Sequence, residues 1–303
     1  MQPILNFDSL TAHLLSIPSR RKRVAVACPH DSHTAEAVEA AINEGFADFI
    51  LVGRGDIIDA LPVVKQHPER ISTIAIDDTD EAARKAVALV RAGEADVLMK
   101  GLLNTDNLLR AVLDKENGLL PRGRVLSHIT ASQIPGHDRL LFFSDAAVIP
   151  FPTPEQRAAQ VGYMAEVVRA FGIECPRIAL IHCSEKSSPK FPVTADYAAL
   201  KEQAAAEAFG CATIDGPMDV KTACDPHSGA VKGIVSPING QADAMLMPDI
   251  ESGNVFYKTL TCFAGATNAG MLVGTSAPVV LPSRSDSTRS KLYSLAMACL
   301  TAG

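Results

Sequence analysis

Short apolar strand patterns alternate with amphipathic helix patterns along most of the chain. In the first third, strand patterns at Val24–Cys28, Phe49–Val52 and Asp96–Met99 are separated by helical patterns. Strands separated by helices of this length pair in parallel, and the helices pack on the sheet. Hydrophobic residues make up 47% of the chain and aromatic residues only 5%, which suits strands buried as aliphatic runs. The pattern predicts an α/β protein with a mainly parallel sheet and helices on both of its faces.

A proline-rich segment marks the expected domain boundary. Residues Pro150–Gln156 read PFPTPEQ, and Thr153-Pro154 within them is typical of a helix cap followed by a first-turn proline. A chain of 303 residues is long enough for two domains. We therefore expect a first α/β domain over residues 1–150 and a second over residues 151–282. The last segment, about residues 283–303, is expected to return to the first domain.

Charge and composition limit the partners. A net charge of −6 argues against nucleic acid or an anionic membrane as a partner. No apolar run has membrane-spanning length, and the N-terminus lacks the features of a signal peptide, so we expect a cytoplasmic protein. The seven cysteines show neither CxxC nor zinc-ligand spacing. Most of them, Cys28 and Cys299 for example, are interpreted as small buried hydrophobic residues of a reduced protein.

A polar loop near the C-terminus is the first candidate site. An apolar strand at Pro278–Leu281 leads into the loop Ser283–Ser287, and a helix follows. The start of a helix presents unpaired N–H groups and a positive dipole, and Arg284 would add a planar fork of donors suited to phosphate. We interpret the loop as a phosphate site that includes Ser285 and Asp286. In the alternative interpretation, Asp286 or its neighbour is an ordinary helix N-cap.

Other polar side chains stand where predicted strands end, the edge at which parallel sheets bind ligands. At this edge we predict Lys100, Ser127, His128, Ser144 and Asp145. A second loop follows the strand Arg177–Ile181 and supplies further candidate anion donors, Ser184, Lys186 and Ser187. Cys183 lies in the same loop and is interpreted as a packed thiol, because no pattern of His–Asn or His–Asp partners accompanies it. Each residue at the strand ends is, taken alone, more typical of a cap or turn than of a ligand, and only several of them converging at one edge would indicate a site.

Seven sequence blocks, taken in order, resemble the phosphate acetyl/butyryltransferases. The blocks are MKGLLNTDNLLRAVL, LSHI, SDAAVIPFPTPEQ, IHCSEKSSPKF, DGPMDV, ADAMLMPDIESGNVFYKTL and PSRSDSTRSKLYSLA. They extend over nearly all of the chain from about Ala95 onward. The last block and the VFYK motif are most similar to the phosphate butyryltransferase branch.

The resemblance implies both a reaction and a fold. The reaction is transfer of an acyl group from coenzyme A to inorganic phosphate, which gives an acyl phosphate and the free thiol. Coenzyme A is then a substrate or product, and no separate cofactor or metal is expected. The implied fold has two domains and three layers, like that of isocitrate and isopropylmalate dehydrogenases, with the active site in the interdomain cleft. The family is oligomeric, so a homo-oligomer is expected.

The resemblance also implies roles for particular residues. The Ser-Arg pair of the family matches Ser283 and Arg284, with the arginine binding phosphate and the serine assisting near the thioester. A threonine-to-arginine stretch makes Arg110 a second anion ligand, and the serine-rich loop matches Ser184 to Ser187. The remaining predicted substrate-binding residues lie in the ADAMLMPDIESGNVFYKTL block: Asp249, Asn254 and Lys258.

Two departures from the acetyl branch favour the butyryl branch. Ser290 stands where the acetyl branch has an Asp that is assigned as the base for the thiol of coenzyme A. No Arg follows Tyr257-Lys258, although the acetyl branch has one there. The general base therefore stays open, with Asp286 or the substrate phosphate as candidates.

Three alternatives accompany this interpretation. One is a phosphate acetyltransferase. Another is a metal- and NAD-dependent 2-hydroxy acid dehydrogenase on a related fold, which needs clustered carboxylates to bind the metal. The available aspartates, which lack i, i+4 helical spacing, are Asp215, Asp219, Asp225 and Asp249. The third is a non-catalytic acyl-CoA binding protein.

Overall fold

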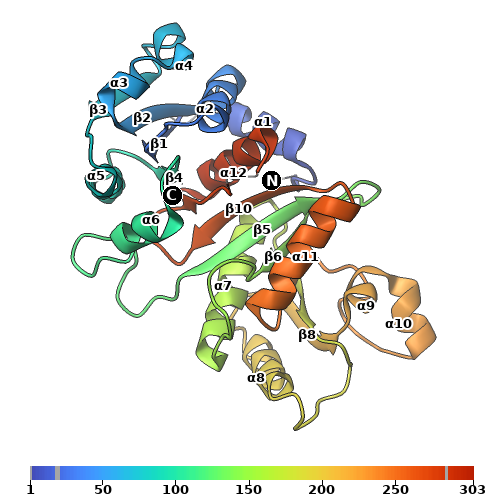
Figure 1. Ribbon diagram of the computed structural model, residues 1–303. Helices are drawn as coiled ribbons and strands as arrows, with labels where there is room; N and C mark the ends of the chain where they lie inside the picture. The colour runs from blue at the N-terminus through green and yellow to red at the C-terminus, as the bar shows by residue number, and fades with distance from the viewer. Residues whose placement is uncertain (1, 18–20, 284–285) are drawn as a thin grey trace. The chain divides into compact units, whose positions relative to one another are not determined.

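The computed structural model describes residues 2–17, 21–283 and 286–303 (Figure 1). Its internal contacts divide the chain into two compact units. We call Phe7–Leu126 with Asn268–Gly303 the N/C unit, and Ser127–Thr267 with the residues before Phe7 the middle unit. This division falls near residues 126 and 267. The domain limits expected near residues 150 and 282 remain a prediction.

The N/C unit is a mainly parallel sheet with helices packed on it. Its strands run in the order β3-β2-β1-β4-β11-β10, and every pair is parallel except β10 with β11. The strands are β1 Lys22–Ala27, β2 Ala47–Gly53, β3 Ile71–Ala75, β4 Val97–Lys100, β10 Thr267–Val273 and β11 Val279–Val280. The helices are α1 Phe7–Ser16, α2 Ser32–Glu44, α3 Gly55–Ile58, α4 Pro62–Gln66, α5 Thr79–Arg91, α6 Thr105–Val112 and α12 Thr288–Thr301.

The middle unit has the same kind of architecture. Its strands run in the order β5-β6-β9-β7-β8, with β5 antiparallel to β6 and the other pairs parallel. They are β5 Ser127–Gln133, β6 Leu141–Ser144, β7 Arg177–Ile181, β8 Thr213–Met218 and β9 Ala244–Leu246. The helices are α7 Pro154–Ala170, α8 Val193–Ala205, α9 Val220–Cys224, α10 Pro226–Lys232 and α11 Ile250–Phe263. The α/β class and the mixed, mainly parallel pairing agree with the sequence pattern.

Burial explains why the predicted strands form. The apolar run Val24–Cys28 is fully buried, as expected for a strand covered on both faces. The last helix, α12, packs against α1, α2 and β11 of the N/C unit (Figure 1). Its residues from Tyr293 to Cys299 are all buried. Packing on α2 brings the start of α12 close to the start of α2, and this contact matters for the site below.

Helix ends follow the sequence signals closely. Thr153 and Gln156 form a reciprocal capping box at the start of α7, and Pro154 occupies the first turn as predicted. Ser287 caps α12 by accepting a hydrogen bond from the Ser290 N–H at 3.1 Å. Gly45 ends α2 at φ 87°, a left-handed conformation that favours glycine.

The sequence Asp215-Gly216-Pro217 is typical of a turn, but these residues belong to strand β8. β8 is the last strand in its order, and its register with β7 shifts between Ala179 and Ile181. Gly216 has φ 150°, and a Cβ there would lie 2.5 Å from the Leu180 carbonyl oxygen. A Gly-Pro pair therefore marks an irregularity in an edge strand here, which is one of the few strand positions open to proline.

Three further elements differ from the sequence expectation. The glycines spread over residues 216–240 favour an irregular segment, but it contains α9 and α10, whose first turns are capped by Asp219 and Asp225. The sequence Gly53-Arg54-Gly55-Asp56 is typical of a turn, yet α3 begins within it. Strand β10, with the sequence TNAGMLV, was not predicted, because its small residues have weak strand propensity.

The cysteines only partly follow the expectation. Cys28 and Cys299 are buried thiols, as predicted. Cys175 and Cys211 form a disulfide, so the expectation of fully reduced cysteines is wrong for this pair. Cys183 is exposed rather than packed. Among the described residues, no helix is both long enough and apolar enough to cross a membrane.

Candidate active site

A small cavity at the start of α12 brings together two of the residues predicted from the sequence. Its volume is about 210 Å³, and we call it the Ser283 cavity. The described residues that line it are Asp31, His33, Thr34, Lys100, Gly101, Leu102, Pro282, Ser283 and Lys291. All of them belong to the N/C unit. They come from the loop after β1, the loop after β4 and the segment around the start of α12, so the cavity lies where strands end and helices begin.

Lys100 places an ammonium group on this cavity. It is the last residue of β4, all of whose residues are buried, and it is only 4% exposed. Its Nζ donates to the carbonyl oxygens of Gly101 at 3.3 Å and Leu103 at 3.2 Å. The loop is held close to β1, because a Cβ on Gly101 would lie 2.2 Å from the Cys28 carbonyl oxygen. Only glycine fits at that position, and the tight approach fixes the direction of the neighbouring lysine.

Ser283 lies at the other side of the cavity, in a turn closed by Asp286. The Ser283 N–H donates to Asp286 Oδ2 at 2.8 Å, and the Asp286 N–H donates to the Ser283 carbonyl oxygen at 3.1 Å. Asp286 thus has a local structural contact, while Ser287 is the cap of α12. The other two predicted loop residues, Arg284 and Ser285, lie outside the described residues, and their roles remain predictions.

Sequence reasoning missed Lys291 and Asp31. Lys291 is 3% exposed, and its Nζ lies 3.5 Å from Asp31 Oδ1. Asp31 caps α2 and accepts hydrogen bonds from the Thr34 N–H at 2.9 Å and the Thr34 hydroxyl at 2.6 Å. Burial raises the pKa of the Asp31 carboxyl, but the hydrogen bonds from Thr34 and the charge of Lys291 outweigh burial and lower it overall. Asp31 therefore stays a carboxylate near neutral pH.

The electrostatics of the Ser283 cavity favour an anion. Two ammonium groups, those of Lys100 and Lys291, are almost fully buried in its wall, and burying a charge is costly unless an opposite charge accompanies it. Asp31 is the one acidic residue among the described lining residues. The positive ends of α2 and α12 add to the field, and neither helix has an acidic residue in its first turn.

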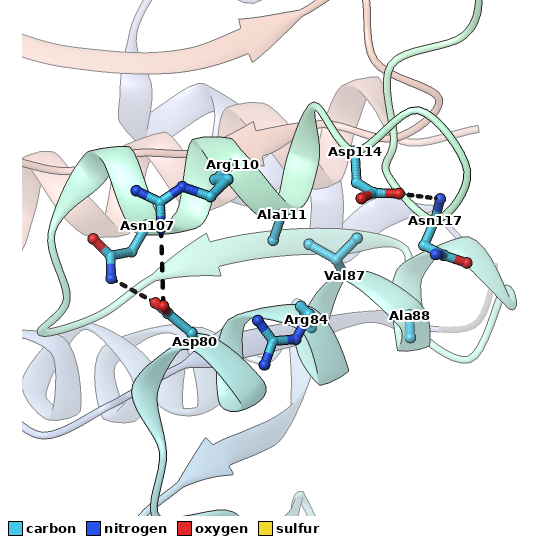
Figure 2. A pocket seen from close by; sticks show the side chains of 9 residues that line it. All are labelled: Asp80, Arg84, Val87, Ala88, Asn107, Arg110, Ala111, Asp114 and Asn117. Carbon is cyan, nitrogen blue, oxygen red and sulfur yellow. Dashed lines mark hydrogen bonds and ion pairs between the residues drawn. The ribbon is translucent and has the colours of Figure 1, made fainter.

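Arg110 lies in a different cavity, between α5 and α6, whose volume is about 360 Å³. Figure 2 shows Val87 and Ala111 between the two helices, with polar side chains around them. The Arg110 guanidinium lies 3.9 Å from Asp80 Oδ2 and is 72% exposed. Asn107 also donates to Asp80, at 2.5 Å. Its lining combines three apolar residues with two arginines and two aspartates, so the cavity offers guanidinium donors for an anionic group but no net positive charge.

Ser127 and Asp145 form a buried network in the middle unit. Both are no more than 1% exposed, and the Ser127 hydroxyl donates to Asp145 Oδ2 at 2.8 Å. Gln160 Nε2 donates to the Ser127 hydroxyl at 3.2 Å. Asp145 also accepts from the backbone N–H groups of residues 147, 148 and 149. These contacts hold the turn after β6. A substrate-binding role for the pair remains a prediction, as it does for half-buried His128, which lies 3.5 Å from the Thr130 hydroxyl.

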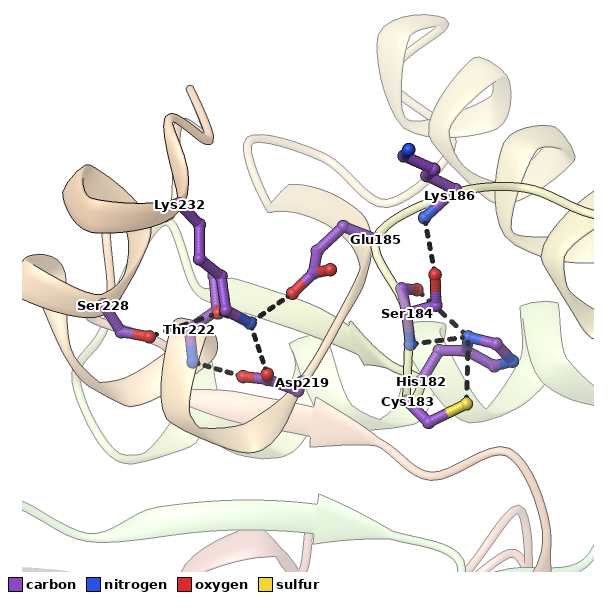
Figure 3. A network of polar contacts seen from close by, with 9 residues as sticks. All are labelled: His182, Cys183, Ser184, Glu185, Lys186, Asp219, Thr222, Ser228 and Lys232. Atoms are coloured by element: carbon purple, nitrogen blue, oxygen red, sulfur yellow. Dashed lines mark hydrogen bonds and ion pairs between the residues drawn. The ribbon is translucent and has the colours of Figure 1, made fainter.

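The serine-rich loop after β7 is attached to α9 and α10 by one lysine. Lys232 Nζ donates to Glu185 Oε1 and to Asp219 Oδ2, both at 2.5 Å (Figure 3). The Ser184 hydroxyl accepts from the Lys186 N–H at 3.2 Å. The Lys186 and Ser187 residues are exposed, and the Lys186 side chain points away from the network (Figure 3).

The three predicted residues of the α11 region do not gather at one point. Asp249 caps α11 by accepting from the Ser252 N–H at 2.8 Å. Asn254 donates to the Ala146 carbonyl oxygen at 3.1 Å. Lys258 is exposed, with its Nζ 4.7 Å from the centre of the Tyr257 ring. The Asp249 and Lys258 contacts lie within the α11 region, while the Asn254 contact joins α11 to the turn after β6. Substrate binding by the three residues stays a prediction.

The aspartates considered for a metal site are engaged elsewhere. Lys201 lies 2.6 Å from Asp215, Lys232 lies 2.5 Å from Asp219, and Asp225 caps α10. In the described part of the chain, no three His, Cys, Asp or Glu side chains gather as metal ligands. This arrangement gives no structural support to the dehydrogenase alternative.

Comparison with known proteins agrees with the motifs. A family model described as phosphate acetyl/butaryl transferase matches residues 69–299. The phosphate butyryltransferase of Clostridium acetobutylicum is 42% identical over 284 residues, which cover 93% of this chain and 94% of that protein. The phosphate acetyltransferase of Thermotoga maritima is 35% identical over 283 residues, 93% of this chain and 95% of that protein.

A solved structure extends the likeness to the fold. The branched-chain phosphotransacylase from Enterococcus faecalis V583 superposes with a TM-score of 0.83 at 31% identity. The match covers 93% of this chain and 99% of that one. These similarities confirm the resemblance derived from the seven sequence blocks. The chain therefore belongs to the phosphate acetyl/butaryl transferase family.

Proposed function

We propose that the protein transfers a short-chain acyl group, preferably butyryl, between coenzyme A and inorganic phosphate. The observation that carries the proposal is the Ser283 cavity, in which the buried ammonium groups of Lys100 and Lys291 line a space of about 210 Å³. Inorganic phosphate is the small anion that the family's reaction requires. The butyryl preference is supported by the butyryltransferase relative of Clostridium acetobutylicum.

The chemistry needs no covalent acyl-enzyme. An oxygen of phosphate attacks the thioester carbonyl carbon, the new C–O bond forms, and the C–S bond breaks to release the thiolate of coenzyme A. Lys100 and, as the family resemblance implies, Arg284 bind the attacking phosphate, while the Ser283 hydroxyl donates to the oxyanion that develops on the carbonyl. Donors fixed in position before the reaction contribute about 2.7 to 4 kcal/mol each to such a transition state. Holding both substrates in one ternary complex supplies much of the remaining acceleration.

The coenzyme A side of the reaction is assigned to the remaining predicted residues. Arg110, which lines the cavity between α5 and α6, is the proposed ligand of an anionic group of coenzyme A. Lys186 and the serines around it are further candidates for its phosphates. Family likeness supports three further parts of the proposal: the cleft between two domains, the likeness to isocitrate and isopropylmalate dehydrogenases, and the homo-oligomer. It also supports the expectation that no separate cofactor is needed. Composition supports a cytoplasmic location and the expectation of no membrane or nucleic-acid partner.

A chain-length series tests the function. Purified protein is mixed with acyl-CoA substrates from acetyl to hexanoyl, and free thiol is followed with a thiol dye with and without inorganic phosphate. We expect phosphate-dependent release that is fastest with butyryl-CoA. Equal release without phosphate would indicate a thioesterase, and a maximum at acetyl-CoA would indicate a phosphate acetyltransferase. Binding of coenzyme A by calorimetry with no turnover of any substrate would indicate a non-catalytic binding protein.

The Arg284→Ala variant tests the predicted catalytic pair. We expect the KM for phosphate to rise about tenfold and kcat to fall about 100-fold, because charge and positioning at the transition state are lost together. Arg289→Ala is the matched control, since the Arg289 guanidinium contacts Tyr293 at 3.0 Å and does not line the Ser283 cavity. Initial rates over a range of phosphate concentrations give both constants. Unchanged constants in Arg284→Ala would remove this residue from the mechanism.

A further inference from the structure

Lys291 occupies an unfavourable position for a lysine. It lies in the first full turn of α12, where the helix dipole is positive and repels an ammonium group. It is also only 3% exposed, so water does little to solvate its charge. A structural residue at this position would be an apolar one that packs against α2. The charge of Lys291 therefore calls for a partner within the Ser283 cavity.

Asp31 is an incomplete partner. The separation of 3.5 Å between Lys291 Nζ and Asp31 Oδ1 is longer than a strong ionic hydrogen bond. The two oxygens of Asp31 already accept from the Thr34 N–H and hydroxyl at 2.9 and 2.6 Å. Asp31 is thus held by its capping contacts and does not close on the lysine. It keeps the Lys291 side chain directed at the cavity without satisfying the charge.

The charges of the cavity wall leave a place for an anion. Among its described lining residues, Lys100 and Lys291 are cationic and Asp31 is the one carboxylate, so the wall has an excess of one positive charge. A phosphate, with more charge than a carboxylate and several acceptor oxygens, is the stronger partner for a buried ammonium group.

We propose that Lys291 is a phosphate-binding residue, and that its ion pair with Asp31 is the resting contact that incoming phosphate replaces. The inference rests on the proposed function and deepens it, because it names a residue for the phosphate substrate. Asp31 acts on phosphate only through Lys291: it is the resting partner of the Lys291 ammonium group and competes with phosphate for it.

Two variants with opposite expected effects test the proposal. Lys291→Met keeps the unbranched side chain and removes its charge; we expect the KM for phosphate to rise at least tenfold while the KM for butyryl-CoA stays within twofold. Asp31→Asn keeps a side chain that caps α2 as well as Asp does, and it removes the competing charge. We expect the KM for phosphate to fall about threefold in this variant. A merely structural pair would shift both substrates together, and neither variant would improve phosphate binding.

A control variant and a binding measurement distinguish a failure of the proposed Lys291 role from a failure of the proposed function. Lys85→Met removes an exposed lysine of α5 that lines no described cavity, and it should leave both KM values unchanged. Calorimetric titration of inorganic phosphate into each protein without coenzyme A should show weaker binding in Lys291→Met and tighter binding in Asp31→Asn. An unchanged phosphate affinity in Lys291→Met, or a weakened one in Asp31→Asn, would overturn the inference. Phosphate binding to the unmodified protein without acyl transfer would instead overturn the proposed function.

Discussion

Replacing Lys100 with methionine is expected to lower kcat/KM for phosphate by about 100-fold, or about 2.7 kcal/mol of transition-state stabilisation. The reason is that the Lys100 ammonium is buried in the wall of the Ser283 cavity and fixed there by the carbonyl oxygens of Gly101 and Leu103. A cation that is already fixed in position needs no reorganisation when negative charge develops on the reacting groups. Methionine fills the same space along β4 but cannot stabilise that charge.

The expected loss in Lys100→Met is distinguished from misfolding by two further measurements. The melting temperature should stay within a few degrees of the unmodified protein, because methionine keeps the packing along β4 and removes an ammonium group whose burial is itself costly. The KM for butyryl-CoA should stay within about threefold, and Lys85→Met should behave as the unmodified protein. A Lys100→Met enzyme that keeps its phosphate kinetics would show that the Ser283 cavity does not hold the nucleophile.

The largest expected effect on stability is that of Asp145→Ala. We expect the free energy of unfolding to fall by about 3 kcal/mol, because four donors lose their acceptor at a site that is 1% exposed. With an unfolding entropy of about 2.1 cal/mol/K per residue, this corresponds to a drop of about 5 °C in melting temperature if the chain of 303 residues unfolds as one unit. Circular dichroism during heating measures it.

Two comparison variants make this stability prediction specific. Asp145→Asn keeps one acceptor oxygen for the N–H groups of Ala147 and Val148, but its amide cannot accept from Ile149 or Ser127. It should therefore lie between Asp145→Ala and the unmodified protein. Asp138→Ala removes a side chain that is 86% exposed and should change the free energy of unfolding by less than about 0.5 kcal/mol. Equal melting temperatures for Asp145→Ala and Asp138→Ala would contradict the structural role of the buried network.

Local patterns in the sequence were sufficient for much of the fold. The alternation of apolar strands and helices predicted the α/β class, and Thr153-Pro154 predicted the start of α7, because both signals act within one or two helical turns. The Gly216-Pro217 pair misled, since a bulge in an edge strand uses the same residues as a turn. Helices α9 and α10 were missed because helices this short show too little periodicity.

The sequence predicted Lys100 and Ser283 of the Ser283 cavity but not Lys291 or Asp31. Ser283 and Lys100 stand at strand ends, a position with a general functional meaning. Lys291 and Asp31 meet only because α12 packs against α2, and no local pattern shows a contact between residues so far apart in the chain. One sequence signal could have identified Lys291. A lysine in the first turn of a helix that has no acidic residue there is unusual, because the helix dipole is positive at that end. The pairing of Cys175 with Cys211 was hidden in the same way.

Phosphorus NMR of the complete reaction tests the central claim, that inorganic phosphate itself attacks the acyl carbon of the thioester. Protein, butyryl-CoA and inorganic phosphate are mixed, and the phosphorus spectrum is recorded while free thiol is assayed in parallel. The account predicts that an acyl phosphate resonance grows mole for mole with the released thiol, at the expense of inorganic phosphate. Release of thiol while the inorganic phosphate signal stays constant would contradict it.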